Sequence, residues 1–202
     1  MIVLIIFKYQ SIMFITIFLR TFDCFNITIT YIINHMNKGY IVVTDKWLKD
    51  QKAKLPIIQN RDVVVGSDGK TYRRSDEEVD MTFEPKKEDI EAAEWWKEIK
   101  GGVIKLNPRL NMPEGIKTAD LEIDGIQVEV KTLYGEGKWA IFNLFNKVKQ
   151  ADTYLINIAN SPLSKSEIRD QIELLFKSNS RKWINMVIVR DKDELIEVYK
   201  RT

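Results

Sequence analysis

Cysteine and histidine are almost absent from this chain. Its 202 residues include one cysteine, Cys24, and one histidine, His35. A single cysteine excludes an intramolecular disulfide and a zinc cluster, and it is typical of a cytoplasmic protein. His35 lies outside residues 84–202, where the compact pattern of helices and strands falls. Catalysis by paired histidines or by a Ser-His or Cys-His pair is therefore excluded there, and acid–base chemistry is left to carboxylates, lysine or a metal-bound water.

The chain also lacks a dominant charge and an uninterrupted apolar run. Its net charge is +2 and 30% of its residues are charged, which excludes a polycationic coat for nucleic acid. Residues 1–19 are rich in Ile, Phe and Met, but Lys8 and Gln10 interrupt them. A transmembrane helix needs about 20 nearly unbroken apolar residues, and a cleaved signal peptide needs a charged start and a small-residue cleavage site. Neither pattern fits, so we expect no association with a membrane.

A turn signal organises the most informative part of the sequence, residues 118–132. Asp124-Gly125 stands between alternating apolar and polar residues, which predicts a two-residue β-hairpin. We expect its strands over residues 121–123 and 126–131. Because side chains alternate between the two faces of a strand, the second strand has one apolar face and one polar face.

Two carboxylates and one lysine meet on the polar face of this hairpin. Glu129 and Lys131 are neighbours on the second strand, and the hairpin brings Asp120 near them. Carboxylate oxygens are the ligands that Mg²⁺ prefers, and an ammonium beside such a site can stabilise the charge that develops on a phosphate. These are the requirements for cutting a phosphodiester. A charged solvent face on a strand gives the same residues, so the three positions alone leave both interpretations open.

The order of predicted elements indicates an α/β (α+β) fold, with a mixed β-sheet flanked by helices. Proline in the first turn and Gly101-Gly102 at the end bound the first helix. Ser164 and Glu167 have the spacing of a capping box at the start of the last helix. The full expected order is helix 85–100, strand 103–106, the hairpin, helix 140–152, strand 154–158, helix 164–178, and strands 184–189 and 194–199.

In this context, the spacing Asp-x8-Glu-x-Lys resembles the PD-(D/E)xK nuclease superfamily. The resemblance implies a core of helix, three strands, helix and strand, and it implies that Asp120 and Glu129 bind Mg²⁺ or Mn²⁺ with help from the backbone carbonyl of Val130. It also makes Asp120, Glu129 and Lys131 the catalytic residues. The sequence departs from the superfamily pattern at Ala119, which stands in place of a proline that sets the backbone and binds no metal.

A longer resemblance covers most of the chain from about Asn37. The chain looks like a phage and mobile-element protein family of the minor-head type from Gram-positive hosts, whose C-terminal domain resembles the tRNA-nuclease domain of contact-dependent growth-inhibition toxins. The segments that carry it are 43–47, 55–58, 107–109, 114–120, 129–131, 135–138, 149–151 and 163–168. The resemblance implies a nuclease that acts on RNA, most specifically tRNA. It further implies an immunity protein or a phage head or tail component as a partner.

Three sections follow from these patterns. Residues 1–35 form an apolar leader, which is a poor membrane anchor, a part of the fold, or translated upstream sequence. We favour the last interpretation, because Met36 stands just before the resemblance begins. Residues 36–83 form a small β-rich section, which is either a tether to a larger assembly or an added sheet that completes the fold. Residues 84–202 form the nuclease-like domain.

Several residues outside the hairpin are candidates for binding the substrate. Glycines in residues 135–138 allow a close backbone approach to a phosphate, and the neighbouring aromatic ring can stack on a base. The predicted substrate-binding residues are Lys138, Arg109, Lys147, Gln150 and Trp139. Glu91 and Glu94, on the first helix, are candidates for an additional carboxylate, although a solvated helix face is the more common explanation.

The sequence therefore predicts a metal-dependent endonuclease that cleaves RNA. Two alternatives stay open. One is a metal-independent tRNase that relies on Lys131, Lys138 and Arg109. The other is a phage structural or adaptor domain that keeps the scaffold without the activity.

Overall fold

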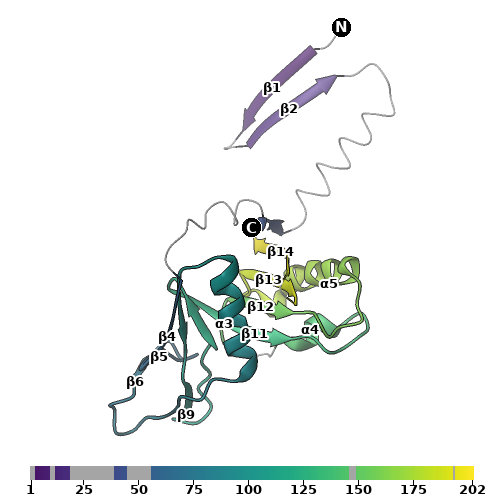
Figure 1. Cartoon of the computed structure of the whole chain (residues 1–202). Helices are drawn as coiled ribbons and strands as arrows, with labels where there is room; N and C mark the ends of the chain where they lie inside the picture. Colours follow the sequence, from purple (N-terminus) through teal and green to yellow (C-terminus); the bar gives the residue numbers. More distant parts are fainter. Residues whose placement is uncertain (1–2, 10–11, 19–38, 45–55, 146–148, 193) are drawn as a thin grey trace. The chain divides into compact units, whose positions relative to one another are not determined.

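The computed structural model describes residues 3–9, 12–18, 39–44, 56–145, 149–192 and 194–202 (Figure 1). Its contacts divide the chain into two units, Met1–Gly39 and Tyr40–Thr202. In the first unit, strands β1 (Val3–Tyr9) and β2 (Ile12–Phe18) pair antiparallel. These two strands belong to the segment that we predict to be an apolar leader.

The second unit is built on one eight-stranded mixed sheet, which confirms the predicted fold class. Strands β11, β12 and β13 run parallel, and the remaining neighbours pair antiparallel except for β4 with β8. The strands across the sheet are β3 (Tyr40–Val42), β14 (Glu194–Arg201), β13 (Met186–Asp191), β12 (Thr153–Asn157), β11 (Ile126–Thr132), β10 (Leu121–Ile123), β8 (Val103–Leu106) and β4 (Ile57–Asn60).

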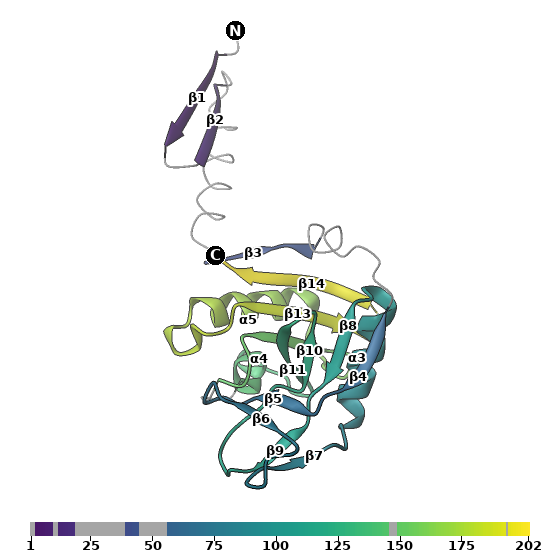
Figure 2. The same cartoon turned by 90° about the vertical axis from the view of Figure 1, so that its left-hand side faces the viewer.

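Helices cover both faces of this sheet (Figures 1 and 2). Helix α3 (Lys87–Ile99) places Trp95 and Trp96 against Val128 and Val130 of β11 in one buried cluster. Helices α4 (Ala140–Leu144) and α5 (Lys165–Lys177) pack on the other face, and a short 3₁₀ helix, η1 (Asn179–Arg181), follows. Because side chains alternate along each strand, the same strands supply both clusters.

The predicted hairpin is present as β10 and β11, with Leu121 opposite Val128 and Ile123 opposite Ile126. Asp124 and Gly125 both have positive φ, at 47° and 88°, as a primed two-residue turn requires. The first strand and the capping box of the last helix are also confirmed, since β8 spans Val103–Leu106 and Ser164 caps α5 together with Glu167. The prediction that proline stands in the first turn of the first helix is wrong, because α3 begins at Lys87 and Pro85 precedes its N-cap, Lys86.

The section over residues 36–83 contributes to the sheet at both of its edges. Strand β3 pairs with β14, and strand β4 pairs with β8. Two smaller pairs complete the section: β5 (Val63–Val65) with β6 (Thr71–Arg73), and β7 (Asp80–Thr82) with β9 (Arg109–Met112). Residues 40–42 and 57–60 therefore extend the sheet that also carries the hairpin.

The helix predicted over residues 140–152 is wrong in its length, because α4 ends at Leu144. Phe145 adopts an extended backbone and its ring packs edge-on against Tyr154, with the ring centroids 4.7 Å apart. Its carbonyl accepts a hydrogen bond from Arg181 Nη2 at 3.0 Å. The helix ends here because the Phe145 ring is buried and the Phe145 carbonyl is hydrogen-bonded to Arg181. Residues 149–152 therefore form a loop that leads into β12.

Candidate functional site

The three predicted catalytic residues line one cavity of about 420 Å³. Asp120 lies just before β10, and Glu129 and Lys131 lie on β11, so the hairpin brings them together as predicted. The rest of the wall comes from segments on either side in the sequence: residues 84–86 and 89, 107 and 109–111, 116–119, and 150.

The backbone holds Asp120 in a fixed position. Its Oδ2 accepts a hydrogen bond from the Val130 N–H at 2.8 Å, and its carbonyl accepts one from the Asn107 N–H at 3.0 Å. Pairing of β10 with β11 ends at Leu121 and Val128, so Val130 has no strand partner on this side. Because the N–H and C=O of one strand residue point to the same edge, the Val130 carbonyl also points toward Asp120.

Glu129 is buried, with 2% of its surface exposed. Its Oε1 lies 2.5 Å from Lys131 Nζ, while its Oε2 is buried and has no hydrogen-bond partner. Glu129 is therefore buried although it lies on the polar side of β11, and residues 84–86, 89 and 150 line the same cavity. An ion pair with one unsatisfied oxygen is an incomplete solution for a buried carboxylate.

The carboxyl groups of the cavity disturb one another's ionisation. Burial and the charge of Asp120 raise the pKa of Glu129 to about 7, and Lys131 opposes the rise. Burial also raises the pKa of Asp120, against the hydrogen bond from Val130 and the charge of Lys131. Two carboxyls that cannot both ionise easily mark a site that is suited to a proton or a cation.

Asp89 is a third carboxylate at this cavity, and our sequence reasoning missed it. It is buried, at 7% exposure, and its Oδ2 accepts the Lys86 N–H at 3.2 Å. Burial and the charge of Asp120 raise the pKa of Asp89 to about 6. The signal in the sequence was its place in the first turn of the helix, three residues after the N-cap. Glu91 and Glu94, the predicted candidates, line a different cavity with Arg190.

Two of the predicted substrate-binding residues are at the cavity and two are not. Arg109 and Gln150 line it, and Arg109 Nη2 donates to the Glu84 carbonyl at 3.1 Å. Lys138 and Trp139 are exposed beside each other before α4, and neither lines the cavity. Lys147 lies outside the described residues.

Lys86 is a further cation at the cavity that the sequence did not reveal. It lies at the N-cap of α3, and its charge lowers the pKa values of Asp89, Asp120 and Glu129. The negative and positive groups of the cavity are therefore mixed, as a site for both a cation and a phosphate requires.

The residues present fit a divalent cation of the hard, oxygen-liking kind. Across the described ranges, no three Asp, Glu, His or Cys side chains gather as a ligand set. Mg²⁺ is nevertheless usually bound through one or two carboxylates and several waters, so Asp120, Glu129 and the Val130 carbonyl are a sufficient set. The unpartnered Oε2 of Glu129 is the atom that such an ion would satisfy.

Part of the chain is similar to a known family of toxin domains. Residues 117–195 match the model of the contact-dependent growth inhibition CdiA C-terminal domain. No curated protein and no solved structure matches the chain. The match includes Asp120, Glu129 and Lys131, and it indicates a toxin-type domain over that range. The predicted relation to a phage minor-head family stays a prediction.

No helix within the described part of the chain has the length and apolar character needed to cross a membrane.

Proposed function

We propose that residues 84–202 form a metal-dependent endonuclease that cleaves RNA, with tRNA as its substrate. The observation that carries this proposal is the Glu129 carboxylate, which is buried beside Asp120 and Lys131 and keeps one oxygen without a hydrogen-bond partner. Burying a carboxylate in this way costs free energy of folding, and binding of a divalent cation would offset that cost. The similarity to toxin domains supports a nucleic acid of the target cell as the substrate.

Each residue of the cavity has a role in this proposal. Asp120, Glu129 and the Val130 carbonyl would hold Mg²⁺ or Mn²⁺, which supplies polarisation of the phosphate and a more acidic water when bound. Lys131 would stabilise the negative charge that develops on the phosphate. Arg109 would bind a flanking phosphate and Gln150 the substrate strand. Lys138 and Trp139, which do not line the cavity, would contact parts of the RNA farther from the cut, and Lys147 stays a predicted substrate-binding residue.

The test is to incubate the full chain with total tRNA and with plasmid DNA, each in Mg²⁺ and in EDTA. We expect cleavage of tRNA in Mg²⁺ only, and an intact plasmid. Glu129→Gln and Asp120→Asn should both be inactive, while Glu88→Gln, an exposed carboxylate on the same helix turn as Asp89, should retain full activity. Cleavage of plasmid in place of tRNA would contradict the choice of substrate.

A metal-independent tRNase is the second candidate, and one observation favours it. The pKa of Glu129 is about 7, so this carboxyl can accept and return a proton near neutral pH. Lys131 and Arg109 would then stabilise the phosphate, whereas Lys138 is not at the cavity. Undiminished cleavage in EDTA would favour this candidate. The absence of cleavage under every condition would favour an inactive adaptor domain.

The proposed setting follows from the proposed substrate. A tRNase works in the cytoplasm, where tRNA is found, and a cell that makes one needs an immunity protein to block the cavity. A domain carried by a phage or mobile element would instead contact a head or tail component. Co-purification of the chain with the product of a neighbouring gene, followed by loss of tRNA cleavage in the complex, would identify the immunity protein.

A further inference from the structure

A second cavity, of about 430 Å³, adjoins the one that holds the carboxylates. Gln150 lines both cavities. Gln127, in the second cavity, accepts a hydrogen bond at 2.9 Å from the side chain of Asn107, which lines the first. The two cavities are therefore neighbours that share a wall of amide side chains.

The second cavity has one rigid wall, the turn between β5 and β6. The Ser67 N–H donates to the Lys117 carbonyl at 2.7 Å, and the Lys117 N–H donates to Ser67 Oγ at 3.0 Å. A side chain on Gly66 would come within 2.5 Å of Ile116, so only glycine permits this close approach. The turn is thus fixed to the segment that leads into Asp120. It lies outside residues 117–195, the range that matches the toxin-domain model.

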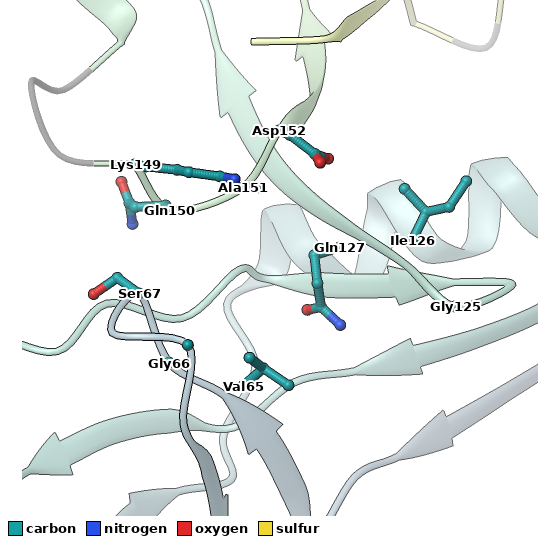
Figure 3. Close-up of a pocket in the computed structure, with 11 residues that line it drawn as sticks. Val65, Gly66, Ser67, Gly125, Ile126, Gln127, Lys149, Gln150, Ala151 and Asp152 are labelled. Carbon is teal, nitrogen blue, oxygen red and sulfur yellow. The ribbon is translucent and has the colours of Figure 1, made fainter. Parts of the chain in front are cut away.

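The lining of the second cavity combines apolar surface with neutral polar groups (Figure 3). Val65 and Ile126 are large apolar residues that are 41% and 49% exposed. Figure 3 shows Gln127 extending from β11 toward Val65, with Gln150 and Ser67 near each other at the left and the Ile126 side chain directed away from Gln127. Lys149 supplies a cation and Asp152 an anion.

This chemistry fits a nucleobase better than a phosphate. The faces of a base are apolar and its edges carry hydrogen-bond donors and acceptors, which matches aliphatic side chains and amides. A carboxylate in the wall disfavours a phosphate and accepts from an amino group. The volume exceeds the lower limit of about 300 Å³ for pockets that bind small molecules.

We propose that the second cavity binds the base of an unpaired nucleotide next to the phosphate that is cleaved. This inference rests on the proposed nuclease function and deepens it, because it restricts the substrate to single-stranded or looped RNA. A base within a continuous duplex is stacked and paired, and it cannot enter a cavity without leaving the helix. The β5–β6 turn, which belongs to the section of residues 36–83, then acts in substrate recognition.

The test measures binding without cleavage, using the full chain with Glu129→Gln. The probes are a fluorescein-labelled 12-nucleotide RNA, the same RNA in a perfect duplex, and versions with one abasic ribose at each position in turn; binding is followed by fluorescence anisotropy. We expect the single strand to bind about tenfold more tightly than the duplex, and one abasic position to lose about tenfold.

Val65→Trp enlarges a half-exposed side chain in the cavity wall, so it should fill the cavity, and an abasic ribose at the sensitive position should then no longer weaken binding. Leu174→Trp is the matched control, since Leu174 is 46% exposed on α5, and it should change nothing. Val65→Ile should bind like the parent, and thermal unfolding checks that the Trp variant is folded. The base site is refuted if the losses in affinity caused by the abasic ribose and by the Trp substitution simply add. It is also refuted if single-stranded and duplex RNA bind equally. The nuclease proposal stands in both cases. No binding of any RNA would refute both.

Discussion

Two parts of the central sheet bury very different side chains. Strands β12 and β13 fill the interior with apolar residues, and Leu155 and Ile188 are fully buried. Strands β8, β10 and β11 instead bury charge. Glu122 is 8% exposed and pairs with Arg61 and with Lys105, the latter at 2.8 Å, and Glu129 is 2% exposed beside Lys131.

The difference separates stability from function within one sheet. Parallel strands that are covered on both faces are ordinarily continuous apolar runs, and β12 and β13 follow that rule except at the buried Thr153 and Arg190. The hairpin departs from it at Glu129, whose pKa is raised by burial and by the charge of Asp120. Because an apolar residue would be easier to bury at these positions, the charges are best explained by chemistry that needs them.

The largest effect should come from the apolar half. Ile188→Ala removes a fully buried side chain from the cluster that contains Trp95 and Trp96, and we expect a loss of about 2–5 kcal/mol in the free energy of unfolding. Urea denaturation measures it, and the rate of tRNA cleavage per folded molecule should be unchanged. A lower rate in the folded fraction would show that the two halves are not separable.

The next effect should come from the charged half, where we expect cleavage to fall while stability is kept. Glu129→Gln keeps the shape of the side chain and removes its charge, so we expect cleavage to fall by about 10²-fold or more and Mn²⁺ affinity to collapse. Lys131→Ala should slow cleavage but leave Mn²⁺ binding nearly intact, because lysine does not bind the ion. Mn²⁺ titration and single-turnover cleavage of labelled tRNA measure both. Full activity of Glu129→Gln in EDTA would exclude the metal mechanism.

A smaller effect should mark Asp89 as a member of the charged half. Asp89 interacts electrostatically with Asp120, but among the described residues it is not part of a three-residue metal-ligand set. The substitution Asp89→Asn removes this buried carboxyl group. We expect a loss of about tenfold in Mn²⁺ affinity, the scale of groups that act on the ligands of a metal. Glu88→Gln, at the exposed neighbour, is the control. Equal effects of the two substitutions would place Asp89 outside the site.

The smallest effect concerns stability against pH without metal. The pKa of Glu129 is about 7 when folded, above its ordinary value of 4.5, so folding favours the protonated carboxyl. This contribution is complete below about pH 4.5 and is lost as the pH rises through 7. In EDTA, the wild type should therefore lose stability relative to Glu129→Gln between pH 5 and pH 8, by on the order of 1 kcal/mol. Urea denaturation at both pH values measures the difference, and a constant difference would contradict the raised pKa.

The sequence by itself determined the local geometry of the site. The Asp124-Gly125 turn and the alternation along β11 placed Glu129 and Lys131 on one face, Gly101-Gly102 marked the end of α3, and the capping box marked the start of α5. These features depend on a few adjacent residues and on the periods of helix and strand, so they can be read without the fold.

Only the tertiary structure decided what closes over that face. Asp89 joins the cavity because α3 packs with its first turn beside the hairpin, and the sequence favoured Glu91 and Glu94 instead. Burial of Phe145 shortens α4 and places Gln150 on a loop between the two cavities. Such placements depend on which distant segments pack together, and no local period encodes that. For this reason the residues that we propose to be catalytic were visible in the sequence, while the burial of their carboxylates was not.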